Sequence, residues 1–349
     1  MDREEAPLDS SRWTHRRVAR TLWVLGVAFI VGVGVLFYEP SRTLSRREVT
    51  LKVEEVALAA SGPAADRVGD LSYVGGLAIR SQDEGFGGLS GLMMDVSDPE
   101  TRIIAVSDQG DRFGARLVIE GGRLRGLDHA TLEPLVDLDG LALRSKKWSD
   151  AESIAQLPDG RVLTGFERHH RIWVYGARVS GPARVFETPA ALQDAPSNGG
   201  LESIATWPDG RVLAITERLR TAGSKVAAFL WEAGRWSSLE WTVSGPGFEP
   251  SDAATLPNGD LLVLERLWSP LGPSHFRTRI VRVKGGDVSA GAVLSGKVIA
   301  ELRAPLITEN FEGLAVHKGE GGVTRLLLVS DDNFTRAQRT LLLMFELRE

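Results

Sequence analysis

The chain contains no cysteine, so it has no disulfide bonds and no thiolate that binds a metal or attacks a substrate. It also lacks a basic surplus: 41 Lys and Arg stand against 46 Asp and Glu, and the net charge is −5. A nucleic-acid-binding domain shows the opposite balance, so no nucleic-acid partner is expected. No H-E-x-x-H motif, P-loop or G-x-G-x-x-G context occurs, which leaves no indication of a zinc protease or a nucleotide-binding fold.

Long stretches with helical periodicity are also scarce. Short apolar runs with Val, Ile, Leu and Trp alternate with turn residues, and the 349 residues include 38 glycines. This pattern predicts an all-β protein, long enough to bury a large core.

The exception is residues 21–38, which contain no charged residue and come close to the length that crosses a bilayer. Arginines are more frequent before this stretch, and no A-x-A-like cleavage site follows it. The sequence therefore predicts a cytoplasmic segment at 1–20, a transmembrane anchor or uncleaved signal at 21–38, a linker with an early strand at 39–68, and an exported domain at 69–349. The expected location is the inner membrane, crossed once, with the C-terminal domain in the periplasm or outside the cell. The alternative is a buried helix of the globular part.

Within the exported domain, the string GLESIATWPDGRVLAITER at 200–218 nearly repeats DAESIAQLPDGRVLTGFER at 150–168. Weaker relatives open with GLSGL at 88, PSDAATL at 250 and NFEGLAV at 310. Each unit is a strand, a turn and a second strand, and most are followed by two looser strands. Four strands repeated every 50 to 60 residues are typical of the blades of a β-propeller.

Five repeats are visible, and the number of blades stays open between five and six. The strand LSYVGGLAI near the N-terminus is expected to pair with LLLMFEL at the C-terminus and close the ring. Strands within residues 49–80 are the candidates for part of a sixth blade.

Acidic residues recur at the open end of each repeated hairpin, away from its turn. Because the first strand of each blade lines the central channel, these acids are expected to surround one of its mouths. The predicted inner ring is Glu152, Glu202, Asp252 and Glu312, with Ser90 as the neutral occupant in the first repeat. A second set beside it is Glu167, Glu217, Glu265, Asp108 and Asp331.

Several carboxylates placed this close repel one another, so arginine or a hard cation must compensate them. Ca²⁺ prefers oxygen ligands of this kind, and the sequence therefore predicts a calcium site. The alternative is that each acid only accepts hydrogen bonds from backbone N–H groups of the next blade. Nearby arginines are candidates for binding an anionic substrate, namely Arg112, Arg168, Arg218 and Arg266. Lys146 and Lys147 are expected to be solvated loop charges.

The ordered strings FGGLSGL with IIAVSDQGDR, DAESIA with PDGRVLTGFER, GLESIA with ITER, and NFEGLAV with LLLVSDDN resemble the phytase-like family, "esterase-like activity of phytase", of bacterial exported proteins. The resemblance runs from about Tyr73 to the C-terminus. It implies a propeller-like fold whose recurrent Glu and Asp hydrolyse phosphodiesters or phosphomonoesters. By motif it implies the same nine acids, although Ser90 and Asp252 depart from the usual residue at their positions.

Three functional hypotheses follow. The first is a Ca²⁺-dependent phosphoester hydrolase that acts on a small anionic, phosphorylated substrate, in a protein attached to the membrane through its N-terminal helix. The second is a non-catalytic periplasmic propeller that binds a ligand or a protein at its mouth. The third is a Ca²⁺-dependent lactonase or esterase.

Overall fold

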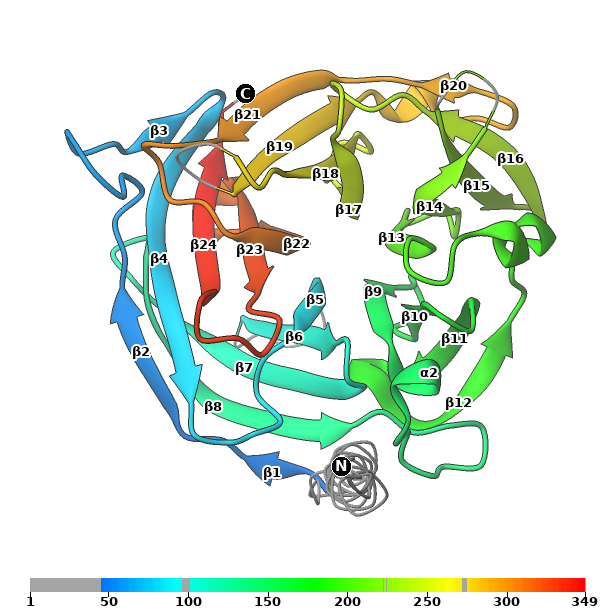
Figure 1. Cartoon of the computed structure of the whole chain (residues 1–349), viewed down its shortest axis with the longest axis horizontal. Coiled ribbons are helices and arrows are strands. Elements are labelled where there is room, and N and C mark those ends of the chain that lie inside the picture. Colours follow the sequence, from blue (N-terminus) through cyan, green and yellow to red (C-terminus); the bar gives the residue numbers. More distant parts are fainter. Residues whose placement is uncertain (1–44, 96–100, 222, 224, 272–274, 349) are drawn as a thin grey trace, which may run out of the picture. The chain divides into compact units, whose positions relative to one another are not determined.

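The computed structural model describes residues 45–95, 101–221, 223, 225–271 and 275–348. They form five β-sheets arranged in a ring, with one strand of each sheet at the centre (Figure 1). The chain is therefore an all-β propeller, and it has five blades. The apolar segment 21–38 lies outside the described residues, and among those that are described no helix has the length and apolar character needed to cross a membrane.

The first three strands of each blade run from the centre of the ring outward in chain order, and in blade 5 the fourth strand comes from the start of the described chain. The innermost strands are β5 (Leu89–Asp95), β9 (Ala151–Gln156), β13 (Leu201–Thr206), β17 (Glu249–Thr255) and β22 (Asn310–Lys318). The second strands are β6 (Arg102–Ser107), β10 (Val162–Phe166), β14 (Val212–Arg220), β18 (Leu261–Trp268) and β23 (Thr324–Asp331). The third strands are β7 (Asp111–Glu120), β11 (Arg171–Gly176), β15 (Val226–Glu232), β19 (Phe276–Val283) and β24 (Thr340–Leu347).

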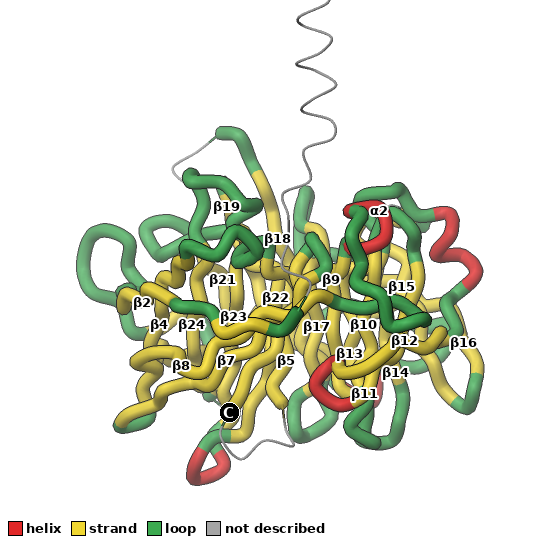
Figure 2. Tube along the Cα trace, turned by 90° about the horizontal axis from the view of Figure 1, so that it is seen from below, coloured by secondary structure: helices red, strands yellow, loops and turns green. Residues whose placement is uncertain are grey.

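The fourth strands are β8 (Arg123–Pro134), β12 (Ser180–Phe186), β16 (Arg235–Trp241), β21 (Lys297–Leu302) and β4 (Leu71–Ser81). Short strands extend three blades: β1 (Arg47–Glu48) on β8, β20 (Val293–Leu294) on β16, and β2 (Leu51–Glu55) with β3 (Arg67–Val68) on β4. The loops carry the short helix α2 (Lys146–Ser149) and the 3₁₀ turns η1 (Ala177–Val179), η2 (Ala190–Asp194), η3 (Gly285–Asp287) and η4 (Glu320–Gly322). Figure 2 shows the strands running between the two faces of the ring, where these loops lie.

The recurring P-D-G and P-N-G strings form the turns of the inner hairpins. In blade 2 the Asp159 carboxylate accepts a hydrogen bond from the Arg161 N–H at 3.0 Å, and Gly160 has a φ of +86° that favours glycine. The same two features recur at Asp209 with Gly210 and at Asn258 with Gly259. Much of the sequence repetition therefore serves a turn that three blades share.

The ring closes where the two ends of the described chain meet in blade 5. β4 pairs antiparallel with β24, with Leu77 opposite Leu342, which confirms the pairing predicted for LSYVGGLAI and LLLMFEL. β2 then extends the sheet on the other side of β4. The early strands enlarge blades 1 and 5, and they do not form a sixth blade.

The hydrophobic core lies between neighbouring blades. Five clusters of buried apolar side chains fill these spaces, and the one that includes the closing strands contains Phe311, Leu341, Leu343 and Phe345, all fully buried. Apolar residues thus fix the blades to one another and leave the ends of the inner strands free to carry polar side chains.

This packing predicts that Leu343→Ala lowers the free energy of unfolding by about 2–5 kcal/mol, because it leaves a cavity at the closing seam. The control is Leu271→Ala at an 82% exposed position, with an expected change of less than about 0.5 kcal/mol. Urea unfolding measures both. Equal effects would contradict closure through the β4–β24 pair.

Candidate functional site

A cavity of about 560 Å³ lies where the inner strands begin, and we refer to it as the ring cavity. Its charged lining consists of eight acids and four bases: Asp108, Glu152, Glu167, Glu202, Glu217, Glu249, Glu312, Asp331, Lys146, Arg168, Arg218 and Arg266. Uncharged polar and aromatic side chains complete it, namely Asn198, Asn310, Asn333, Gln338, Trp268 and Phe276. The hollow at the other ends of the inner strands, beside the hairpin turns, has mostly apolar walls. The polar chemistry is therefore concentrated at one mouth.

A β-bulge lies at the start of each inner strand, and in blades 2, 3 and 5 it directs a side chain into this mouth. In blade 2, Ala151 pairs with Phe166 and Ser153 with Gly165, which leaves Glu152 as the extra residue. Glu202 in blade 3 and Glu312 in blade 5 occupy the same place. Ser90 falls in the corresponding bulge of blade 1, as predicted. Bulges are common beside functional sites because they re-aim a side chain.

Blade 4 breaks this pattern by one residue. Pro250 pairs with Glu265 and Asp252 with Leu264, so Ser251, not Asp252, is the bulged residue equivalent to Glu202. The same register makes Arg266, not Glu265, the equivalent of Glu217. The predicted placement of Asp252 and Glu265 in the ring is therefore wrong, because one residue along a strand turns a side chain to the other face.

The two displaced acids have structural partners outside the ring cavity. Asp252 is fully buried and accepts hydrogen bonds from the N–H groups of Ala253 at 2.8 Å and Leu314, in the next blade, at 2.7 Å. Glu265 accepts hydrogen bonds from the Trp241 indole at 2.8 Å and from the Ser244 N–H. For Asp252 this matches the alternative interpretation, in which an acid serves blade packing.

Arg112 also lies outside the ring cavity. It forms an ion pair with Glu133 on the neighbouring strand and donates a hydrogen bond to the Arg178 carbonyl at 2.6 Å. The other three predicted arginines do line the cavity, as do Asp108, Asp331 and the five predicted glutamates of blades 2, 3 and 5.

Arg266 crosses the ring between two blades. Its Nη2 donates to the Glu217 carboxylate of blade 3 at 2.8 Å, while its Nη1 donates to Asn310 and forms an ion pair with Glu312 of blade 5. Only 16% of its side chain is exposed. The carboxylates around it raise the pKa of Arg266 despite its burial, so it is a permanent cation that compensates two of the ring acids.

Arg168 and Arg218 lie at equivalent positions at the rim, each directly after a ring acid. Arg168 forms an ion pair with Asp150, and Arg218 donates to Glu249 at 2.8 Å. Lys146, on α2, bridges Asp108 and Asp150 at 2.6 Å each, so it is part of the cavity and is not the solvated loop charge expected. The three cations are thus held at the mouth.

Asp150 and Glu249 were not among the predicted site residues. Both stand two residues before a bulge position, as does Asn310 in blade 5. That spacing is the signal in the sequence that identifies them.

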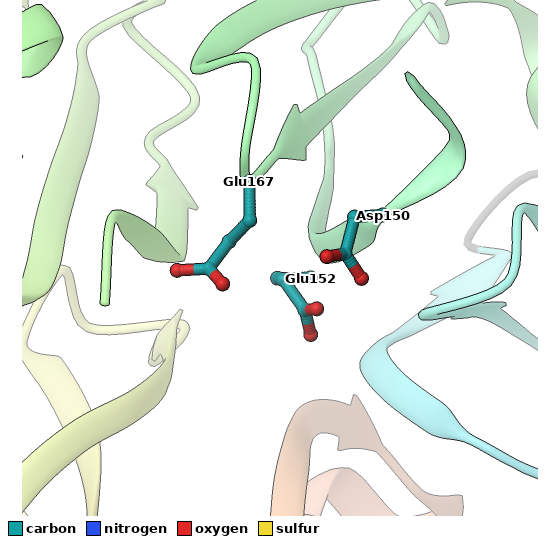
Figure 3. A group of neighbouring side chains, drawn as sticks. All are labelled: Asp150, Glu152 and Glu167. Carbon is teal, nitrogen blue, oxygen red and sulfur yellow. The ribbon is translucent and has the colours of Figure 1, made fainter. Parts of the chain in front are cut away.

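Asp150, Glu152 and Glu167 form the one group of metal-ligand type found among the described residues, with ligand oxygens all within 4.8 Å of one another. Figure 3 shows the three carboxylates converging on one space. The Gly199 N–H donates to Oε1 of Glu167 at 2.6 Å, and the Gly200 N–H donates to the same atom, which fixes this carboxylate. An all-oxygen donor set of this kind fits a hard divalent cation.

Glu152 and Glu202 are the uncompensated acids of the ring. Each is nine-tenths or more buried, with 9% and 6% exposed, and within the described part of the chain neither carboxylate accepts a hydrogen bond from an N–H group or forms an ion pair. Burial raises the pKa of both well above 4.5, and the neighbouring carboxylates raise it further. A bound cation would supply the ion pair that both carboxylates lack among the described residues.

Glu217 and Asp331 also have raised pKa values. Burial raises the pKa of Glu217 to about 7, against the opposing effect of Arg266 and Arg218. Burial, with Glu312 and Asp108 nearby, raises the pKa of Asp331 well above its usual value. The ring cavity therefore contains carboxyl groups that keep their protons to unusually high pH, and Glu217 exchanges its proton near neutral pH.

The family model described as phytase-like, esterase-like activity of phytase, matches residues 84–334. The sequence matches no curated protein.

Solved structures that match this chain share little of its sequence. A gluconolactonase from Xanthomonas campestris is 12% identical, with 86% of this chain and 99% of that chain covered and a TM-score of 0.43. The endo-arabinase from Bacteroides thetaiotaomicron is 13% identical, with 76% of this chain and 96% of that chain covered and a TM-score of 0.46. The calcium-binding protein regucalcin from Agrobacterium tumefaciens is 12% identical, with 84% of this chain and 95% of that chain covered and a TM-score of 0.42. Likenesses at this level carry no conclusion about chemistry.

The raised pKa values predict that cation-free protein becomes less stable as the pH rises. An unfolded chain loses glutamate protons near pH 4.5, whereas folded Glu152 and Glu202 retain them to higher pH and Glu217 to about 7. The contribution of these protonated glutamates to the free energy of unfolding is therefore complete below pH 4.5, and it is lost as the pH rises through their pKa values in the folded protein. Urea unfolding in chelator between about pH 5 and pH 8 measures this slope. Glu152→Gln with Glu202→Gln is expected to flatten it, and an unchanged slope would contradict the assignment.

Asp252 is expected to behave differently because it serves packing. Asp252→Ala leaves the N–H groups of Ala253 and Leu314 unbonded and is expected to cost about 2–4 kcal/mol of unfolding free energy, with unchanged cation affinity per folded molecule. Calorimetric unfolding and titration measure the two quantities. If the folded variant lost cation binding, Asp252 would be part of the cation site and the packing role would be contradicted.

Proposed function

The chain belongs to the phytase-like family, and from this membership and the geometry of the ring cavity we propose that it is a Ca²⁺-dependent hydrolase of small anionic esters, with phosphoesters as its substrates. The observation that carries the proposal is the pair of buried carboxylates, Glu152 and Glu202, that lack a compensating donor beside the convergent group of Figure 3. Uncompensated buried charge is costly, and proteins retain it where a ligand supplies the counter-charge.

Glu152 and Glu167 would hold the cation, with Glu202 and Asp150 adjacent to them. When bound, a divalent cation polarises an ester oxygen and lowers the pKa of a water molecule. Oxygen ligands from carboxylates favour Ca²⁺ over softer metals, which prefer sulfur or imidazole.

The chain's own cations provide the binding site for the anionic group. Arg168 and Arg218 stand at the mouth, and Asp150 and Glu249 hold their guanidinium groups in place. A guanidinium binds two oxygens of a phosphate or carboxylate at once. The position of these arginines favours a substrate whose charged group enters from the rim.

Glu217 is placed to exchange a proton with the substrate or with water. It lies in the ring cavity, and its pKa of about 7 gives it both protonation states at neutral pH. A carboxyl group with such a value serves as a general acid or base.

The location is a separate part of the proposal. The uncharged residues 21–38 and the arginines before them support an anchor in the inner membrane that holds the propeller in the periplasm. There the ring cavity would be supplied with Ca²⁺ and with small anionic esters from outside the cell.

The proposal predicts that hydrolysis of a nitrophenyl phosphate monoester or diester requires Ca²⁺ and stops in chelator. Glu152→Gln and Glu202→Gln are each expected to weaken Ca²⁺ binding at least about 10-fold and to lower turnover further, with the fold retained. The matched control is Asp159→Asn, an exposed acid of the same hairpin at the turn end, with unchanged binding and turnover.

A nitrophenyl acetate and a lactone, assayed in parallel, identify the substrate class. Turnover of these compounds alone would move the protein to the lactonase or esterase hypothesis. Calcium binding without turnover of any substrate would favour a non-catalytic binding propeller.

A further inference from the structure

Blade 4 replaces the charges that the other blades carry at the ring. Its bulge position holds Ser251 where blades 2, 3 and 5 have glutamate, and the second position holds Arg266 where the other four blades have an acid. One blade therefore contributes a cation to a ring that is otherwise acidic or neutral.

The contacts of Arg266 show which acids this cation serves. It reaches Glu217 in the preceding blade and Glu312 in the following one, and Asn310 accepts a further hydrogen bond from the same guanidinium. These groups offer the oxygen donors that would surround a metal ion if no arginine were present. Arg266 occupies the place between them.

The opposite side of the ring has no such cation. Glu152 and Glu202 belong to blades 2 and 3, accept no N–H donor and form no ion pair in the described part of the chain, and are each at least nine-tenths buried. Glu167, with its carboxylate fixed by two backbone N–H groups, lies beside them. The side formed by blades 2 and 3 therefore contains two buried acids that no described lysine or arginine pairs with.

We propose that Arg266 is a built-in counter-cation that takes the place of a metal ion on the blade 4 side, so that the ring binds a single divalent cation on Glu152 and Glu167, with Glu202 adjacent to them. This inference rests on the proposed cation-dependent function and specifies the number and position of the ions. It also gives Arg266 a positioning role, because it fixes the Glu217 and Glu312 carboxylates in the wall of the ring cavity.

Calcium stoichiometry, measured by isothermal titration of the full chain, tests this inference. The wild-type protein is expected to bind one Ca²⁺. Arg266→Gln frees Glu217 and Glu312 and is expected to bind two. Arg282→Gln is the matched control, since Arg282 is on β19 of the same blade and pairs with Asp260 away from the cavity, and it is expected to bind one.

Within the described residues, Arg266→Gln leaves buried Glu312 without an ion pair and Glu217 with Arg218 alone, so a second variant covers the case in which it does not fold. The triple variant Arg266→Gln, Glu217→Gln, Glu312→Gln removes the cation together with both acids, and it is expected to fold and to bind one Ca²⁺. Its melting temperature with and without Ca²⁺ provides a second reading, with an increase expected on Ca²⁺ addition.

The outcomes separate the inference from the function on which it rests. A wild-type protein that binds no Ca²⁺ would overturn the cation-dependent function itself. One ion in both the wild type and folded Arg266→Gln would overturn only the role of Arg266. Two ions in the wild type, or loss of binding in the triple variant, would place a metal ion on the Arg266 side and would contradict the proposed position.

Discussion

Repulsion between carboxylates at one mouth of the propeller is the constraint on which the rest of this site depends. Five blades deliver their inner strands to one axis, so any acid at the start of a strand meets its counterparts from the other blades. The structure compensates this charge in two different ways. Arg266 forms ion pairs with Glu217 and Glu312, whereas Glu152 and Glu202 form none in the described part of the chain. The asymmetry of the ring follows from this division.

Much of the fold could be predicted from the sequence because its signals are local and repeated. The turn strings marked the inner hairpins, their recurrence indicated a propeller, and the apolar end strands indicated how the ring closes. The number of blades could not be predicted, because the sequence pattern does not show whether the early strands β1 and β2 form part of a separate blade. Only the tertiary structure shows that they join the edges of existing sheets.

The candidate site was predicted less completely, and blade 4 shows why. Asp252 and Glu265 resemble the acids of the other blades in type, but each is one residue out of register. In a strand with a period of two, that shift moves a side chain from the channel to the packing surface. Counting from the turn would have revealed it, because Ser251 and Arg266 are 15 residues apart, as are Glu202 and Glu217. Ion pairs such as Lys146 with Asp150 depend on loop geometry that no periodicity encodes.

The ring cavity thus combines a fixed internal cation, rim arginines held by acids, and buried carboxylates that lack a counter-charge. The claim at the centre of this account is that a divalent cation supplies that charge on the side of blades 2 and 3. The most direct test is an anomalous difference map from crystals grown with Ca²⁺. The account predicts one peak within about 2.3–2.6 Å of carboxylate oxygens of Glu152 and Glu167. A peak between Glu217 and Glu312, or no peak in the ring cavity, would contradict it.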